Sequence, residues 1–250
     1  LRVANTILCS FYVDSIMTSG SMLDRQVKEF SIALKRFSRI KALTLSFPEN
    51  YELTNKSLNY LSRTLPCNKS VQALKLNLRN CFKIGNEGIS SFCGSTRRLS
   101  LKDIEFNLTQ AGTMTKVIEP LTKLMKDHNT LESIGLSFMD LNNQLVIDFE
   151  LLSSGFQGLR SLKSLELIFA NLFASPANIL SELGTGISYL LTLKTLSLNF
   201  ITSSCITDKS VSELVVGFQC LAALTNLKLT FSHCIGISDE GLQALGEAIE

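Results

Sequence analysis

The sequence lacks tryptophan and has only two histidines and four prolines among its 250 residues. His128 and His233 have no second histidine or carboxylate at the spacing of metal ligands, so each is predicted to be solvated or bonded locally. No G-x-S-x-G motif, phosphate-binding loop or dinucleotide-binding glycine pattern occurs either. The sequence therefore predicts no catalytic residue, no metal site and no cofactor.

An excess of charge of one sign and a long apolar run are also missing. The 24 Lys and Arg residues are balanced by 22 Asp and Glu, and they are spread along the chain. This balance predicts neither a nucleic-acid partner nor a polybasic membrane surface. Apolar runs stay far short of the ~20 residues that cross a bilayer, so no membrane insertion is predicted.

The seven cysteines have none of the spacings of a disulfide framework or a zinc site. Their number is odd and no C-x-x-C pair occurs among Cys9, Cys67, Cys81, Cys93, Cys205, Cys220 and Cys234. Such usage is typical of reduced thiols that are buried as small apolar side chains. A cytoplasmic protein is therefore expected.

One eight-residue pattern recurs through most of the chain. LKTLSLNF at 193–200 returns as LTNLKLTF at 224–231, and both fit the template apolar-x-x-apolar-x-apolar-x-apolar. The template starts seven times, at intervals of 30 or 31 residues, over 40–47, 71–78, 101–108, 131–138, 162–169, 193–200 and 224–231. A fixed period of this length is the signature of a repeat architecture.

Each repeat is predicted to contain a strand followed by a helix. Leu196, Leu198 and Phe200 alternate with polar residues, which is the period of a half-buried strand. The following ITDKSVSELVVGF places apolar residues on one helical face. Short acceptor side chains just before the helices are predicted to cap them, and these are Asn55, Asn86, Asp208 and Asp239.

Helical crossovers make successive strands parallel. Strands pack ~4.8 Å apart and helices ~9 Å apart, so equal numbers of each bend the array by roughly 25° per repeat. The predicted fold is an α/β solenoid with the parallel sheet on the concave side and the helices on the convex side.

The repeats resemble the leucine-rich repeat in its ribonuclease-inhibitor-like strand–helix form. CIGISDEGLQALGEAI at 234–249 and KIGNEGISSF at 83–92 are similar to that family's helix starts. The period of 30–31 residues resembles long protist arrays, notably those of ciliates, and no asparagine ladder follows the strands. The resemblance implies a horseshoe-shaped leucine-rich-repeat solenoid.

The first 39 residues lack the template. The stretch 8–16 lies one period upstream and is a candidate strand, and 23–37 has the pattern of its helix. We therefore expect a degenerate N-terminal repeat or cap over 1–39 and seven repeats over 40–250, the last one truncated. Because the chain starts at Leu1 and stops after a helix, an excerpt of a longer protein is expected.

The resemblance implies a scaffold or protein–protein interaction module whose partner is another protein and which has no catalysis of its own. Concave strands are the usual binding surface of solenoids. The strongly charged outward positions there are Lys75, Arg79, Glu105, Glu166 and Lys228. Three alternatives stay open. The array could regulate a kinase or ubiquitin ligase in the same chain, it could be a subunit of a large cytoskeletal or ciliary assembly, or binding could use the helices and rims.

Overall fold

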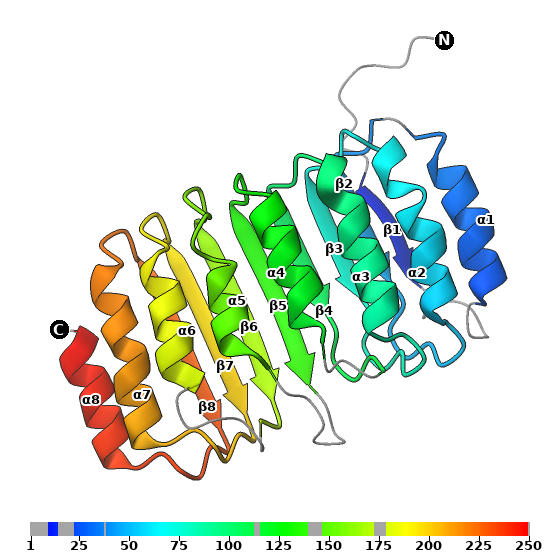
Figure 1. Ribbon diagram of the computed structural model, residues 1–250. Coiled ribbons are helices and arrows are strands. Elements are labelled where there is room, and N and C mark those ends of the chain that lie inside the picture. The colour runs from blue at the N-terminus through cyan, green and yellow to red at the C-terminus, as the bar shows by residue number, and fades with distance from the viewer. Residues whose placement is uncertain are drawn as a thin grey trace.

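The computed structural model describes residues 10–14, 23–37, 39–112, 116–139, 147–172 and 179–249. Within these ranges one parallel sheet contains eight strands in sequence order (Figure 1). The strands are β1 (Ser10–Asp14), β2 (Ala42–Ser46), β3 (Ala73–Asn77), β4 (Asp103–Asn107), β5 (Ser133–Met139), β6 (Ser164–Ala170), β7 (Thr195–Ile201) and β8 (Asn226–Ser232).

A helix follows every strand and runs back in the opposite direction. The helices are α1 (Asp24–Leu34), α2 (Asn55–Ser62), α3 (Asn86–Ser95), α4 (Ile118–Asp127), α5 (Phe149–Ser154), α6 (Ile179–Ser188), α7 (Asp208–Val216) and α8 (Asp239–Ile249). Short 3-10 helices follow three of them: η2 (Leu65–Cys67), η3 (Thr96–Arg98) and η4 (Gly217–Cys220).

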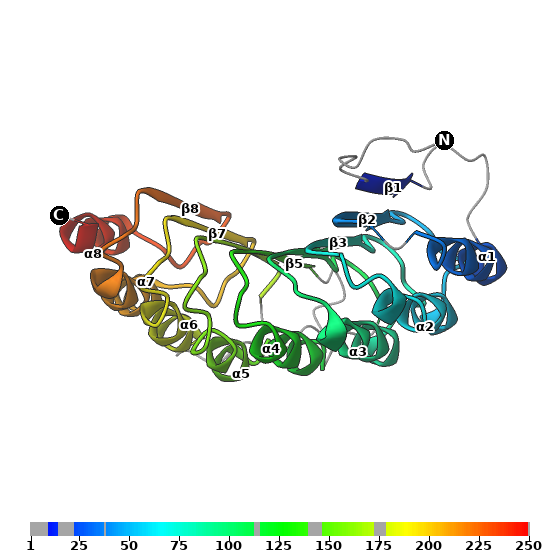
Figure 2. The same ribbon diagram turned by 90° about the horizontal axis from the view of Figure 1, so that it is seen from above.

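The two layers form a shallow arc. Seen from above, the sheet lies on the inner side and the helices lie on the outer side (Figure 2). Helices need more lateral room than strands, so stacking one of each per repeat bends the array toward the sheet. The predicted α/β solenoid, with a concave parallel sheet and convex helices, is confirmed.

The strand register follows the sequence template. Leu165 of β6 pairs with Ile134 of β5 and with Leu196 of β7, so equivalent template positions lie in one row across the sheet. β1 lies within the predicted stretch 8–16 and pairs in parallel with β2, and α1 lies within 23–37. The rest of 8–16 lies outside the described residues.

The core lies between the two layers and runs the length of the array. The inward side chains of β2 to β7 are buried, as Leu43, Leu76 and Leu167 illustrate. β2, β3 and β4 are five residues long, whereas β5 to β8 are seven residues long. In β5 to β8 the eighth template position is part of the strand. In β2, β3 and β4 the same position lies just after the strand, in the following turn.

A column of phenylalanine rings runs through β5 to β8. Phe138, Phe169, Phe200 and Phe231 stack in turn, with ring centroids 5.6 to 5.7 Å apart and interplanar angles of 7° to 19°. The equivalent positions after β3 and β4 hold Leu78 and Leu108, which are also buried. Two side-chain types thus fill the same layer of the core.

A left-handed residue follows the strand in six repeats. These residues have φ between 51° and 62°, and they are Glu49, Asn80, Gln110, Asn171, Thr202 and His233. The conformation turns the backbone N–H toward the next repeat: the N–H of Thr202, for example, donates to the carbonyl oxygen of Ser232 at 2.8 Å. Asparagine tolerates this region, whereas a β-branched residue such as Thr202 is strained in it.

The prediction that four Asn and Asp residues cap their own helices is wrong. Asn55, Asn86, Asp208 and Asp239 are the first residues of their helices rather than the residues before them. The residue one position earlier, Thr54 in α2 or Thr207 in α7, accepts the hydrogen bond from the first turn.

Three of the four side chains predicted as caps instead connect neighbouring repeats. The Oδ1 atom of Asn55 accepts the N–H of Gly85 at 2.9 Å, and Oδ1 of Asp208 accepts the N–H of Ser238 at 2.7 Å. In the same way, Oδ1 of Asp24 accepts the N–H of Thr54, and Oδ1 of Asn86 accepts the N–H of Lys116, each from the following repeat. Each bond satisfies an N–H at the start of the next helix, where no intrahelical partner exists.

Candidate binding surface

The concave face carries one row of outward side chains across the middle of the sheet. The register places Thr44, Lys75, Glu105, Gly135, Glu166, Ser197 and Lys228 side by side in that order. Four of the five predicted binding residues therefore lie in one row. Adjacent members are one strand spacing apart, about 4.8 Å.

Three of the five predicted charges are already paired. Lys75 lies opposite Glu105 and its Nζ forms an ion pair with that carboxylate. Arg79 lies in the turn after β3, and its guanidinium is 2.5 Å from Glu49 of the preceding repeat. These charges neutralise one another on the solenoid. The sequence contains the signal for this, because equivalent positions with opposite charge occur one period apart.

The other two charges lie in the second half of the row. Glu166 and Lys228 are exposed, and within the described residues neither makes an ion pair or a side-chain hydrogen bond. Ser197 lies between them, so two strand spacings, about 10 Å, separate their positions. This part of the face presents one free carboxylate and one free ammonium group.

The second outward row is nearly neutral. It consists of Ser46, Asn77, Asn107, Ser137, Ile168, Asn199 and Thr230. Asn77 is used within the fold, since its Oδ1 accepts the N–H of Arg79 at 3.1 Å. The Oδ1 of Asn199 is shielded from solvent and has no hydrogen-bond partner. The row supplies small polar contacts beside the half-exposed Ile168, without an aromatic anchor.

The six described thiols differ in exposure: three are buried, Cys205 is partly exposed and two are exposed. Burial raises the pKa of Cys81 to about 11 and of Cys93 to about 12, so both stay protonated. Cys234 lies ten residues after the start of its template, as Cys81 does, and it is also buried, as predicted for the cysteines. Cys67 and Cys220 are exposed, and the prediction that the cysteines are buried is wrong for them.

The two histidines have unlike surroundings. His128 is only 4% exposed, and its Nε2 lies 3.2 Å from the Thr96 hydroxyl of the preceding repeat. Burial lowers the pKa of His128, so that the ring is neutral near pH 7. His233 is exposed in the turn after β8. Over the part of the chain that the structure describes, no three His, Cys, Asp or Glu side chains gather as metal ligands.

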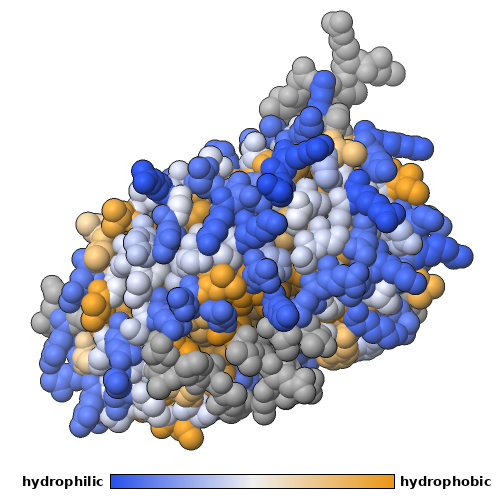
Figure 3. Space-filling view, in the orientation of Figure 1, coloured by the Kyte–Doolittle hydropathy of each residue, from blue (hydrophilic) through white to orange (hydrophobic). Residues whose placement is uncertain are grey.

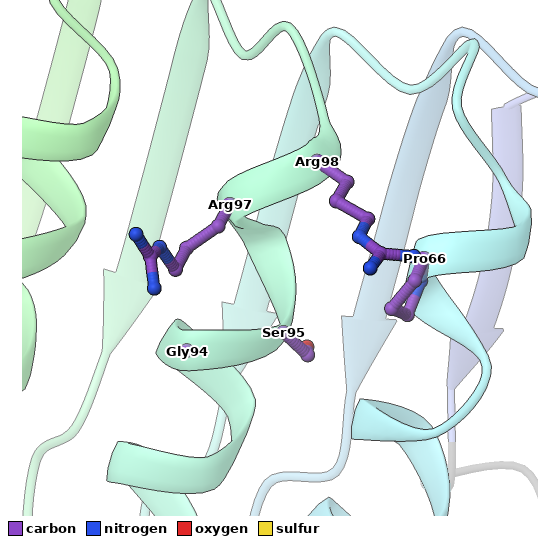
Figure 4. A pocket seen from close by; sticks show the side chains of 5 residues that line it. All are labelled: Pro66, Gly94, Ser95, Arg97 and Arg98. Atoms are coloured by element: carbon purple, nitrogen blue, oxygen red, sulfur yellow. The ribbon is translucent and has the colours of Figure 1, made fainter.

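The helical side of the arc is largely polar. Hydrophilic side chains cover much of it, with apolar ones showing between them (Figure 3). One hollow of about 440 Å³ lies between η2 and η3 and is lined by Pro66, Gly94, Ser95, Arg97 and Arg98 (Figure 4). A second, of about 310 Å³, lies between α6 and α7 beside Val216 and Cys220. In the described ranges, no helix has the length and apolar character needed to cross a membrane.

Comparison with known proteins adds little to this picture. No protein-family model matches the sequence, and no curated protein matches it. Among 73 matching chains of solved structures is one from the crystal structure of the Rad7 and Elc1 complex in yeast. It is 17% identical with a TM-score of 0.43, and the match covers 89% of this chain and 57% of that one. The fold assignment therefore rests on the sheet and helices described above.

Proposed function

We propose that the chain is a leucine-rich-repeat module of the ribonuclease-inhibitor-like type that binds another protein and has no catalysis of its own. The observation that carries this proposal is the free pair Glu166 and Lys228 on a concave sheet. An open concave sheet offers a broad, rigid surface to a partner. Charges that are free on such a surface orient a partner and speed its association.

The proposal locates the contact on β6, β7 and β8. Charges that already pair internally, such as Lys75 with Glu105, would have to exchange that partner for a new one. Glu166 and Lys228 can contact a partner without breaking an ion pair. Ser197 lies between them, and its small side chain leaves room for a side chain of the partner. Ile168 and Thr230 in the neighbouring row complete a mixed polar and apolar contact area.

A structural subunit of a large assembly is the second candidate. Small Ser, Asn and Thr side chains dominate the second concave row, and no aromatic residue occurs there. Interface hot spots favour Tyr, Trp and Arg. A large, shallow contact within a permanent assembly fits this surface without needing an anchor, and the chain would then be recovered mainly in a large complex.

A cytosolic-type compartment is part of the proposal. Support comes from the six cysteines that the structure describes, which are all free thiols.

Capture of the partner at low ionic strength tests the proposal. The captured protein is identified and purified, and its Kd is measured for the unaltered chain and for the double variant Glu166→Lys with Lys228→Glu. We expect the variant to bind about tenfold more weakly, because two exposed contacts become repulsive. The matched control is Lys75→Glu with Glu105→Lys, which exchanges two charges that face each other and preserves their ion pair.

The control should bind the partner within about twofold of the unaltered chain. Equal weakening by both variants would place the contact across the whole concave face. Unchanged binding by the first variant, with its circular dichroism spectrum intact, would remove the concave face as the binding surface.

A further inference from the structure

Lys and Arg side chains gather where α1, α2 and α3 return to the sheet. The three return segments, 35–41, 63–72 and 96–102, hold nine Lys and Arg residues and no Asp or Glu. They lie next to one another because β2, β3 and β4, which follow them, pair in sequence order (Figure 1). We call this edge the basic rim, and its cations are Lys35, Arg36, Arg39, Lys41, Arg63, Lys69, Arg97, Arg98 and Lys102.

The helix ends compensate only a small part of this charge. The C-terminus of a helix carries about half a negative elementary charge, so three helices supply about −1.5. Two of the cations also have acidic neighbours: Arg97 Nε lies 3.2 Å from Asp127, and Lys102 Nζ lies 2.7 Å from Glu132. Together the helix ends and these two carboxylates offset about 3.5 of the nine positive charges.

The remaining cations are available to solvent. Arg63, Lys69 and Arg98 are exposed, and within the described residues they form no ion pair. Arg98 extends along the wall of the hollow toward Pro66, whereas Arg97 points the opposite way (Figure 4). The rim thus combines free guanidinium groups with a hollow of about 440 Å³ between η2 and η3.

The cations are densest at this end of the edge. Further along the same edge, the return segment 155–163 holds Arg160 and Lys163, and the segment 217–225 contains no charged residue. At the opposite edge, cations such as Lys56 and Lys209 are mixed with acidic residues in the first turns of the helices, which are Asp24, Glu87, Glu119, Glu150, Glu182, Asp208 and Asp239. The basic rim therefore has a density of unmixed positive charge that the opposite edge lacks.

We propose that the basic rim docks an acidic, extended segment of a partner protein. The return segments follow helices that pack about 9 Å apart, and three residues of an extended chain span about 10 Å. In the extended polyproline II conformation, which has three residues per turn and a rise of about 3.1 Å per residue, a peptide with a carboxylate at every third position therefore presents one carboxylate to each repeat in turn. One of its side chains enters the hollow beside Arg98.

A protein segment fits better than a nucleic acid. Nucleic-acid-binding domains have pI values above about 9, whereas this chain has a pI of about 8.2 and a net charge of +2. The surface is distinct from the concave face, so it would add a second contact to the proposed protein-binding function.

Fluorescence anisotropy with a labelled peptide tests this proposal. The probe is a peptide of about 15 residues with Glu at every third position, titrated with the whole chain at about 0.05 M salt. The test variant is Arg63→Glu with Arg98→Glu. The matched control is Lys56→Glu with Lys116→Glu, which changes the net charge equally at exposed positions on the opposite edge.

We expect the test variant to bind the peptide about tenfold more weakly and the control to stay within about twofold. Arg63→Gln with Arg98→Gln should weaken binding by about threefold, and it preserves the test if charge reversal disturbs the fold. The same peptide with Gln in place of Glu should not bind. Glu166→Lys with Lys228→Glu should bind the acidic peptide normally, which separates this proposal from the concave contact.

Two results would overturn the proposal. Equal weakening by the test and control variants would mean that the peptide responds only to net charge. Tighter binding of a single-stranded oligonucleotide of about 15 residues than of the Glu peptide would assign the rim to nucleic acid instead.

Discussion

The repeats of β2 to β4 and those of β5 to β8 build the same backbone with different side chains. In the first group, ion pairs join neighbouring repeats, as in Lys75–Glu105 and Lys83–Glu52. In the second group the described residues show two ion pairs: Lys163–Glu132, which joins the repeats of β5 and β6, and Lys209–Glu213, which lies within a single helix. The second group has the longer strands and the phenylalanine column instead.

The difference shows which interactions the repeat needs and which it can exchange. Both groups bury the apolar positions of the template, and both use an Asn or Asp at the helix start to hold the next repeat. Exposed ion pairs contribute little to stability, whereas a buried ring contributes several kcal/mol. The first group should therefore depend on its core almost as much as the second.

The largest expected effect is the loss of a ring from the middle of the column. Phe169 is fully buried and contacts the rings of Phe138, Phe149 and Phe200. Phe169→Ala should lower the free energy of unfolding in urea by ~3–5 kcal/mol. Phe169→Leu, which introduces the side chain used at Leu108, should cost less than half as much. A loss below about 1 kcal/mol for the alanine variant would show that the column does not hold these repeats together.

Loss of the hydrogen bond between the Asn55 side chain and the next repeat should have an intermediate effect on stability. Asn55→Ala removes the acceptor of the Gly85 N–H, and the expected cost is about 1 kcal/mol in the same measurement. Asn55→Asp keeps the acceptor in the form that Asp208 uses but loses the exposed bond that the Asn55 amide donates to Glu87, so it should cost less than the alanine variant. If the aspartate variant were as unstable as the alanine variant, the two groups would not share this device.

A small gain is expected where the second group has a strained residue. Thr202 is β-branched and has a φ of 51°, whereas Asn171 occupies the equivalent place one repeat earlier with a φ of 61°. Thr202→Asn should raise the free energy of unfolding by about 0.5–1 kcal/mol, and Asn171→Thr should lower it by a similar amount. Changes of the same sign in both variants would contradict this explanation.

The smallest effect is expected where ion pairs meet at the boundary between the groups. Glu132 pairs with Lys102 and Lys163, and these hydrogen bonds and charges lower its pKa from 4.5 to about 2. Because the folded pKa is the lower one, Glu132 stabilises the fold above pH 4.5 and loses this contribution as the pH falls toward 2.

The measurement compares Glu132→Gln with the unaltered chain in urea at several pH values and salt concentrations. The difference between their unfolding midpoints should shrink below pH 4.5, and it should also shrink in high salt. A difference that stays constant over this pH range would show that the carboxylate charge contributes nothing.

The sequence predicts the repeated backbone well because each copy of the template corresponds to one strand of the sheet. Leu165 and Leu196 occupy the same template position, so the register of β6 and β7 follows directly from the alignment of the repeats. The role of Asn55 could not be predicted in the same way. A short acceptor at a helix start suits either its own helix or the next one, and only the three-dimensional stacking decides between them.

The clustering of charges at one edge could not be predicted from the sequence either, although the position of every charged residue is known from it. Arg63 and Arg98 are 35 residues apart in the chain, and a search for runs of like charge does not connect them. Stacking the repeats brings their segments side by side and collects the cations at one edge. The pairing of Lys75 with Glu105 has the same origin, because it joins equivalent positions of neighbouring repeats.

The stacking of like repeats has a mechanical consequence. Each repeat is joined to the next by one parallel strand pair, as between β6 and β7, and by a polar bond at the helix start, as between Asp208 and Ser238. Under a pulling force on the array, single repeats should therefore detach while their neighbours stay folded. The template interval is 30 or 31 residues, so each such rupture would lengthen the chain by roughly 100 Å. The solenoid would yield to force in steps of this length, one repeat at a time.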